Sequence, residues 1–306
     1  MTQTFHSNGK LLLTAEFLVV DGARALALPS RFGQSMKLSD GPGSTIYWKS
    51  LTHQGKIWFV GSFVIKNSKI WIKGTTDKAV AERLEQLFSV IHALNPDAFK
   101  GRGLRITTHL EFPRNWGLGS SSTLLANLAQ WAKVNPFILA DRTFGGSGYD
   151  VACAKTDSPL IYERTRDPGN PIIVPADFFP DFSEQLFFVH LNQKQNTRDG
   201  VAAYKMRHPL IKKEWILQMS NLTKAFLECS NLQKFENLMT GHEEFMGQIL
   251  GMPPIKELLF PDFPGAIKSL GAWGGDFILA TGGAAEKNYF KQKGYFVILD
   301  YEKMVL

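Results

Sequence analysis

The chain has 306 residues but only two cysteines, Cys153 and Cys229, and neither belongs to a CxxC pair. Zinc sites and disulfide frameworks need several cysteines or histidines at short, regular spacings. We therefore expect neither of these, and such sparse cysteine is typical of a protein from a reducing compartment.

Long apolar runs are also missing. The strongest early run, from Leu11 to Val20, is interrupted by Glu16 and is too short to span a bilayer. The first residues lack the basic and then apolar pattern of a signal peptide. We expect no membrane association, and a cytoplasmic location is the default expectation.

Several common catalytic motifs are absent as well. The Walker A spacing fails at both Gly-Lys pairs, Gly9-Lys10 and Gly55-Lys56, and no GxGxxG opens a helix after a strand. No GxSxG occurs, and the segment starting at Gly241-His242-Glu243 lacks the second histidine of HExxH. These absences argue against a P-loop, a dinucleotide fold, a hydrolase elbow and a zinc peptidase.

The charge balance is basic, with a net charge of +6. The basic residues are scattered, Lys212-Lys213 is the longest run, and no aromatic RNA-binding box is present. A solvated basic surface is the simplest interpretation, and a cleft for an anionic small molecule is the alternative. We expect no nucleic-acid partner.

Apolar periodicity predicts an α+β chain. Strands are predicted at residues 10–20, 24–28, 46–51, 56–65, 69–73, 104–112, 159–163, 172–174, 186–191, 276–280 and 295–299, and helices at 77–94, 123–134, 211–226, 232–249 and 284–293. The loop-rich stretch 164–184 suggests a division into lobes of residues 1–170 and 171–306. His242 lies on an apolar helical stripe, which favours a packed histidine over a ligand.

A glycine- and serine-rich segment follows the strand at 104–112, running from Pro113 to Gly117-Leu118-Gly119-Ser120-Ser121-Ser122, and an amphipathic stretch comes next. Glycines let the backbone approach an anion closely, and a helix N-terminus supplies unpaired N–H groups and a positive dipole end. Serine hydroxyls add donors and can ligate Mg²⁺. The pattern predicts a phosphate site; the alternative is a tight turn with a serine N-cap.

This segment resembles the nucleotide-binding motif of the GHMP kinases, the superfamily of galactokinase, homoserine kinase, mevalonate kinase and phosphomevalonate kinase. Two further segments agree in order: Asn8 to Gly22 is similar to the family's first motif, and Gly271 to Asp276 resembles its third. The resemblance implies a two-lobed GHMP kinase fold, with a ribosomal protein S5 domain 2-like N-terminal lobe and a ferredoxin-like C-terminal lobe. It also implies ATP and Mg²⁺ as cofactors. The implied ATP-binding residues are Pro113, Gly117, Leu118, Gly119, Ser120, Ser121, Ser122, Gly274 and Gly275.

The segment Gly145-Gly-Ser-Gly-Tyr-Asp150 resembles the aspartate loop of mevalonate-type kinases, in a GYDIA-type bacterial form. The resemblance implies that Asp150 is the catalytic base or orienter and that Lys10 is its cationic neighbour. A lysine beside an aspartate favours the ionised carboxylate and offsets charge on a transferring phosphoryl group. A helix N-cap is the alternative role for Asp150.

The metal and substrate residues follow from the same resemblance. Ser121 corresponds to a Mg²⁺-ligating serine, while Leu139 stands where related kinases carry a glutamate ligand, so Asp141 is the nearest candidate carboxylate. The segment 192–199 is similar to a substrate-contacting segment of mevalonate and phosphomevalonate kinases. This similarity implies substrate contacts for Lys194, Thr197 and Arg198, with helix capping as the alternative for Thr197. The overall resemblance also implies a substrate contact for Glu16, in the first motif.

The sequence therefore predicts Mg·ATP-dependent phosphorylation of a small molecule, mevalonate or phosphomevalonate. A decarboxylase of the same superfamily, acting on diphosphomevalonate, is the second enzyme hypothesis. A non-catalytic GHMP-fold protein that binds a nucleotide or sugar is the third, because Leu139 replaces the metal-ligating glutamate and Trp273 departs from the third motif. Asn8 and Ala15 depart from the first motif and bear on the identity of the substrate. A homodimer is left open.

Overall fold

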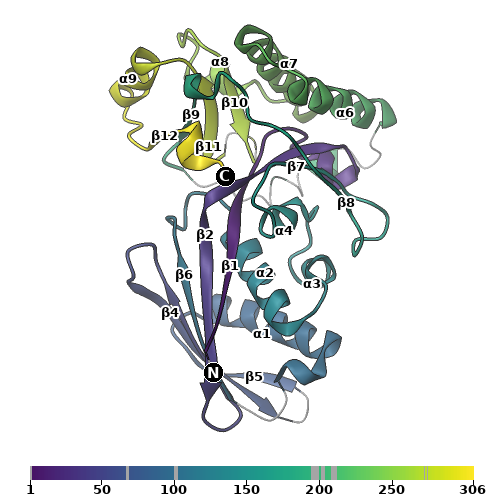
Figure 1. Ribbon diagram of the computed structural model, residues 1–306, viewed down its shortest axis with the longest axis vertical. Coiled ribbons are helices and arrows are strands. Elements are labelled where there is room, and N and C mark those ends of the chain that lie inside the picture. The colour runs from purple at the N-terminus through teal and green to yellow at the C-terminus, as the bar shows by residue number, and fades with distance from the viewer. Residues whose placement is uncertain are drawn as a thin grey trace.

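The computed structural model describes residues 2–66, 69–99, 103–193, 200, 204–207, 212–271, 273 and 275–306. Its strands form two sheets, one in each half of an elongated molecule (Figure 1). Helices accompany both sheets, which confirms the α+β class that apolar periodicity predicted. No helix in the described ranges combines the length and the apolar character that crossing a membrane requires.

The larger sheet belongs to the N-terminal half. Its described strands follow the order β5-β4-β3-β6-β2-β7-β8, and β1 pairs with β2 outside this path. Their bounds are β1 Gln3–Leu12, β2 Ala25–Gly41, β3 Thr45–Leu51, β4 Ile57–Lys66, β5 Lys69–Thr75, β6 Gly103–Leu110, β7 Leu160–Glu163 and β8 Ile172–Pro175. All pairings are antiparallel except that of β3 with β6.

Helices cover one face of this sheet (Figure 1). The helical segments of this half are η1 Leu18–Asp21, α1 Lys78–Leu94, η2 Pro96–Phe99, α2 Ser120–Ala132, α3 Pro136–Thr143 and α4 Tyr149–Cys153. The Asp77 side chain accepts a hydrogen bond from the Val80 amide and so caps α1. Phe88 of α1 and Leu128 of α2 pack with Trp48 of the sheet in one buried cluster.

The C-terminal sheet has the antiparallel order β10-β11-β9-β12. Its elements are η3 Ser183–Gln185, β9 Leu186–His190, α6 Lys213–Leu227, α7 Leu232–Leu250, α8 Ile255–Leu259, β10 Ile267–Leu270, β11 Phe277–Thr281, α9 Ala284–Gln292, β12 Ile298–Asp300 and α10 Tyr301–Met304. The first strand lies between the last and the third, and helices follow the first and third strands. This is the ferredoxin-like arrangement that the resemblance implied.

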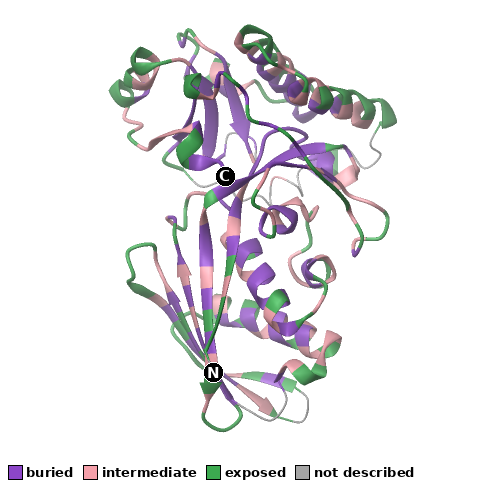
Figure 2. Cartoon of the chain, in the orientation of Figure 1, coloured by how far each residue is buried: buried purple, intermediate pink, exposed green. Residues whose placement is uncertain are grey.

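The two halves share one hydrophobic core, because β1 and β2 extend from one half into the other (Figure 1). Leu28 of β2 and Leu110 of β6 belong to the same buried cluster as Phe188 and Phe277 of the C-terminal sheet. Figure 2 shows the purple, buried stretches of β1 and β2 where the halves meet. Since β8 pairs with β7 across the predicted division at residue 170, the N-terminal sheet continues to Pro175.

One predicted strand is wrong. Residues 10–20 do not form a single strand: β1 ends at Leu12, and Leu18–Asp21 form a 3₁₀-helix. Ala15 and Phe17 adopt positive φ angles of 67° and 62°, which no strand allows. This segment is apolar because it is buried on all sides, and a continuous apolar run does not distinguish a strand from a buried loop.

Candidate active site

A cavity of about 500 Å³ lies where β1, the glycine–serine loop, the Gly145–Asp150 loop and the start of β11 meet. Ser121 and Asp150 line it from the N-terminal half, and Asp276 lines it from the C-terminal half. Elements that are far apart in the sequence therefore converge on one cavity, and most residues predicted from the motifs lie on its wall.

The glycine–serine loop presents the start of α2 to this cavity. The N-cap residue is Gly119, in the left-handed conformation at φ 87°, and no side chain caps the helix. The alternative of a serine N-cap is therefore wrong, because Ser120 is already the first helical residue. The first-turn N–H groups receive no side-chain cap, which is the arrangement that an anion at a helix N-terminus uses.

Only glycine fits at residue 119. A Cβ there would lie 2.6 Å from Ser122 Oγ and 3.1 Å from Lys10 Cγ. The Ser122 hydroxyl donates to the Gly119 carbonyl oxygen over 2.9 Å, and Thr123 bonds the same oxygen at 3.1 Å. These bonds hold the loop in its turn, and Lys10 lies directly against it.

β1 brings Lys10 to the loop through backbone contacts. The Lys10 amide donates to the Leu118 carbonyl oxygen over 3.0 Å, and the Asn8 side chain donates to the Thr156 carbonyl oxygen over 2.7 Å. Asn8, where the family has proline, thus ties β1 to the chain just after α4. The Lys10 ammonium lies 5.6 Å from the centre of the Tyr149 ring.

The Gly145–Gly148 turn places Asp150 in the cavity wall. Gly148 is the N-cap of α4, at φ 94°, so Asp150 is the second helical residue and not the cap. A Cβ at Gly148 would lie 2.7 Å from the Tyr162 hydroxyl, which donates to the Ser147 carbonyl oxygen. The N-cap alternative for Asp150 is wrong, and its Oδ1 accepts a hydrogen bond from the Val151 amide at 3.0 Å.

The ionisable groups of this cavity influence one another. Burial raises the pKa of Asp150, and the charge of Lys10 together with the Val151 amide opposes that rise. Burial alone would lower the pKa of Lys10, but nearby Tyr149, Asp150 and Asp276 raise it above its usual value. Burial raises the pKa of Tyr149 to about 12. Lys10 is therefore cationic at neutral pH, and Asp150 is more basic than an exposed aspartate.

The sequence motifs indicated no role for Asp276, which lines the cavity. Its carboxylate lies against Gly117, at φ 65°, where any Cβ would overlap it. Trp116 makes edge-to-face contacts with Phe32 and Phe277 and so packs the start of the glycine–serine loop against β11. The signal in the sequence was the acidic residue that ends the third glycine-rich motif. Arg114 and Lys205 are further wall residues that the motifs did not identify.

Hard cations such as Mg²⁺ prefer oxygen ligands, and the wall offers the Ser121 hydroxyl and the carboxylates of Asp150 and Asp276. The predicted ligand Asp141 does not reach this cavity: its carboxylate lies 3.6 Å from Arg164. Leu139, at the place of the family glutamate, is fully buried in the core. The prediction that Asp141 is a metal ligand of this cavity is therefore wrong. In the described part of the chain, no group of three or more His, Cys, Asp and Glu side chains could hold a metal.

Glu16 lies in the cavity wall but is only 1% exposed. Its Oε1 accepts a hydrogen bond from Lys268 Nζ at 2.7 Å, and its Oε2 lies 3.1 Å from His242 Nε2. Burial alone would raise the pKa of Glu16, but the interactions with Lys268 and His242 outweigh burial, so the pKa is lowered. His242 is packed in the core, as its place on the helical stripe predicted.

The remaining predicted residues divide into two groups. Lys194, Thr197, Arg198 and Gly274 lie outside the described residues. Pro113 and Gly275 are described but do not line the cavity, where Arg114, Gly271 and Asp276 stand instead. The Pro113 carbonyl oxygen accepts a hydrogen bond from the Trp116 amide at 3.0 Å, so Pro113 shapes the turn that precedes the glycine–serine loop.

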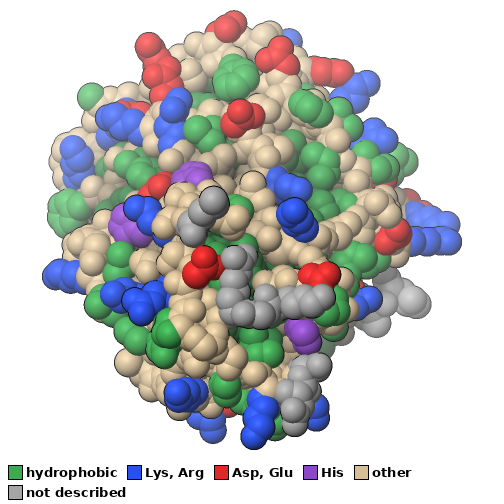
Figure 3. Space-filling view, turned by 60° about the horizontal axis from the view of Figure 1, so that its bottom comes forward, with side chains coloured by type: hydrophobic (Ala, Val, Ile, Leu, Met, Phe, Trp, Pro, Cys, Tyr) green, Lys and Arg blue, Asp and Glu red, His purple; other side chains and the backbone are tan. Residues whose placement is uncertain are grey.

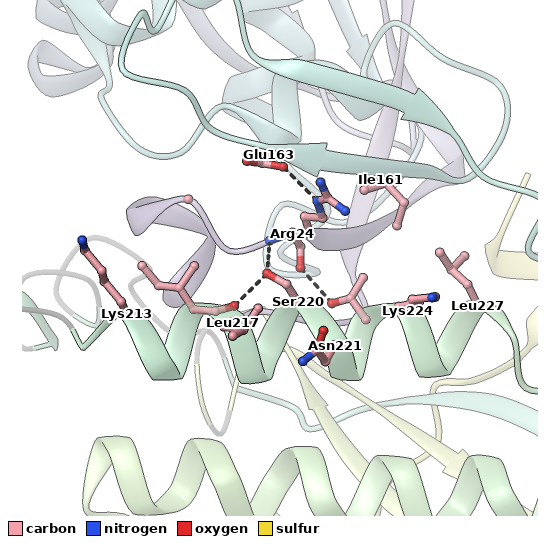
Figure 4. Close-up of a pocket in the computed structure, with 12 residues that line it drawn as sticks. Arg24, Ile161, Glu163, Lys213, Leu217, Ser220, Asn221, Lys224 and Leu227 are labelled. Carbon is pink, nitrogen blue, oxygen red and sulfur yellow. Dashed lines mark hydrogen bonds and ion pairs between the residues drawn. The ribbon is translucent and has the colours of Figure 1, made fainter.

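A second cavity, of about 460 Å³, lies between α6, the turn that precedes β2 and the strand β7. Figure 4 shows Arg24 facing Glu163 above Ser220 of α6. Arg24 Nε is 3.0 Å from Glu163 Oε2, and the Arg24 amide donates to Ser220 Oγ over 3.1 Å. The space-filling view shows Lys and Arg interspersed with Asp and Glu, as expected from scattered basic residues (Figure 3). None of the predicted site residues that the structure describes lines this second cavity, so the cavity at the glycine–serine loop is the candidate active site.

Glu243 supplies a stability test beside this site. It is 2% exposed, and burial, reinforced by Glu16, raises its pKa to about 7 against the opposing effects of Lys268 and Ser269. Between about pH 4.5 and pH 7 the native carboxyl keeps a proton that the unfolded chain has lost, so this group's contribution to stability falls as pH rises. We expect Glu243→Gln to lack this fall and to gain stability relative to the native sequence from pH 5 to pH 8.

Urea unfolding of both proteins at the two pH values measures this difference. Glu244→Gln is the matched control, because Glu244 is the next residue of α7 and is exposed. A difference in unfolding free energy that stays constant between pH 5 and pH 8 contradicts the assignment of Glu243.

No protein-family model and no curated protein matches the chain by sequence. Solved structures do match it. Methanococcus jannaschii mevalonate kinase shares 15% identity at a TM-score of 0.67, covering 98% of both chains. Streptococcus pneumoniae phosphomevalonate kinase, in complex with phosphomevalonate and AMPPNP, shares 14% at 0.71 over 96% of this chain and 98% of its own. Staphylococcus aureus mevalonate diphosphate decarboxylase shares 13% at 0.64 over 99% and 96%. The chain has the GHMP kinase fold.

Proposed function

We propose that this chain is an ATP-dependent small-molecule kinase whose active site is the cavity at the phosphate loop. The observation that carries the proposal is the convergence of the uncapped α2 N-terminus, Lys10 and Asp150 on one cavity. A helix N-terminus suits the phosphates of a nucleotide, and a partly buried carboxylate beside a lysine suits an acceptor hydroxyl.

Each residue of this set has a chemical role in the proposal. The N–H groups of Ser120 to Ser122 and the Lys10 ammonium bind the phosphates and offset the charge that develops on the transferring group. Asp150 accepts the proton of the acceptor hydroxyl or orients that hydroxyl, and its raised pKa makes it a stronger base. Mg²⁺, bound with the nucleotide, would neutralise further phosphate charge.

Mevalonate or phosphomevalonate is the proposed acceptor, since solved mevalonate and phosphomevalonate kinases share this fold. A decarboxylase has the same fold too, so the diphosphomevalonate reaction remains the alternative. The two reactions differ in their products. ATP consumption with mevalonate, phosphomevalonate, diphosphomevalonate, homoserine and common sugars identifies the acceptor, and CO₂ release identifies the decarboxylase.

The nucleotide site can be tested with Gly119→Val. Residue 119 has a positive φ and contacts both Ser122 and Lys10, so the valine displaces the loop. We expect Mg·ATP to raise the melting temperature of the native protein and to have little effect on the variant. A ligand at about 100 times its Kd adds roughly 2.7 kcal/mol of stability.

Gly43→Val is the matched control for backbone strain. Gly43 also has a positive φ, of 60°, but a Cβ there meets no atom within 4 Å. Its melt should respond to Mg·ATP as the native protein does. An equal response from Gly119→Val would refute the assignment of the phosphate loop.

A further inference from the structure

Asp276 places a negative charge beside the glycine–serine loop, which is proposed to bind phosphates. Its backbone is held in place, because the Asp276 carbonyl oxygen accepts from the Leu191 amide of the neighbouring chain segment at 2.9 Å. Its carboxylate occupies the space that a Cβ at Gly117 would fill, so it lies directly against the first glycine of the loop. The Asp276 carboxylate therefore borders both the glycine–serine loop and the cavity.

The charges of the cavity wall are balanced and do not favour a bare triphosphate. Lys10, Arg114 and Lys205 are cations of the described wall, and Glu16, Asp150 and Asp276 are carboxylates. Lys10 is close enough to both Asp150 and Asp276 for their charges to raise its pKa. Its positive charge is therefore shared with two carboxylates before any ligand arrives.

A carboxylate beside a phosphate group repels it unless a cation lies between them. Magnesium is commonly bound through one or two carboxylates together with substrate phosphates, and it retains several water molecules. Asp276 has the chemistry and the place for this role, whereas Asp141 faces Arg164 and Leu139 carries no ligand atom.

We propose that Asp276 is the carboxylate ligand of the nucleotide-bound divalent cation and makes nucleotide binding dependent on that cation. This inference rests on the proposed function of the cavity. It assigns the metal role to a residue at the start of β11, in the C-terminal half, so the bound cation would join the two halves of the molecule.

The test compares ATP binding with and without Mg²⁺ by calorimetry, using the full chain. We expect the native protein to bind Mg·ATP at least about tenfold more tightly than ATP in EDTA, because the metal removes the repulsion. Asp276→Asn should shrink this ratio toward one by weakening Mg·ATP and strengthening metal-free ATP. Asp276→Glu keeps the charge and should keep a preference for Mg·ATP.

Asp141→Asn is the matched control, since it removes a carboxylate outside the cavity; its ratio should equal that of the native protein. Mn²⁺ gives a second readout: in the presence of ATP, its paramagnetic resonance spectrum should show bound metal for the native protein and less for Asp276→Asn. If native protein binds neither ATP form, the proposed function fails and the inference fails with it.

If Mg·ATP binds but the native protein shows no preference for it, the inference alone is overturned. The same holds if Asp276→Asn, with a melting temperature near the native value, retains the full ratio and the full Mn²⁺ signal. Should Asp276→Asn fail to fold, the native preference and the Asp276→Glu variant still decide the question: a Glu variant without the preference contradicts a ligand role that depends on charge.

Discussion

Asp150→Asn is expected to lower kcat by about 10²–10⁴-fold while leaving ATP affinity nearly unchanged. Asparagine preserves the size of the side chain and can still accept from the Val151 amide, so α4 should keep its structure. It cannot accept a proton from the acceptor hydroxyl, and it removes a negative charge from beside Lys10. Phosphoryl transfer through a loose transition state depends less on a base, which favours the lower half of the range.

The measurement is kcat with the acceptor identified by the ATP-consumption screen, together with ATP affinity and the melting temperature. Asp157→Asn is the matched control, because Asp157 is an exposed carboxylate shortly after α4. It should retain native turnover. Turnover of Asp150→Asn within a few-fold of native would leave Asp150 without a catalytic role.

Lys268→Met should strongly lower the free energy of unfolding. Lys268 is fully buried, with its Nζ 2.7 Å from Glu16 Oε1 and 3.7 Å from Glu243 Oε1. Removing one partner of a buried ion pair leaves an uncompensated charge and typically costs about 3–5 kcal/mol. Because Glu16 lies in the cavity wall, the loss of its Lys268 partner should also disturb the structure of that wall. Urea unfolding measures the change in free energy.

Two variants make this result interpretable. Lys303→Met removes an exposed lysine that lies 2.7 Å from Asp300, and a surface pair of this kind is worth about 0–1 kcal/mol. The double variant Glu16→Gln with Lys268→Met removes both charges and should recover part of the lost stability, since a neutral replacement of a buried pair is often tolerated. If Lys268→Met unfolds at the native midpoint, the pair contributes nothing measurable.

The glycine–serine loop at the start of α2 was predictable from the sequence because its geometry is local. Gly117, Gly119 and Ser120 to Ser122 are contiguous, and a turn followed by a helix N-terminus depends only on neighbouring residues. The α1 cap at Asp77 and the apolar stripe of α7 were predictable for the same reason. Lys10 and Asp150 came from family resemblance, and the fold brings both to the cavity wall.

Which residues the charged side chains contact could not be predicted from the sequence in the same way. Asp141 is closer in sequence to the phosphate loop than Asp276 is, yet it faces Arg164, whereas Asp276 reaches Gly117. The difference arises from the sheet of the C-terminal half, whose strand β11 starts beside the loop, and from Trp116, which packs on Phe277. Likewise, Glu16 meets Lys268 across 252 residues of sequence separation.

The sequence by itself therefore determined the helix-forming stripes, the glycine turns with their positive φ angles and the position of the glycine–serine loop. These depend on side-chain periodicity and on backbone freedom, which act over a few residues. The tertiary structure alone decided which carboxylates enter the cavity, that Glu16 is buried in an ion pair and that residues 13–17 form a loop. Those outcomes depend on which distant strands become neighbours, since the environment of a charge is set by every element that packs around it.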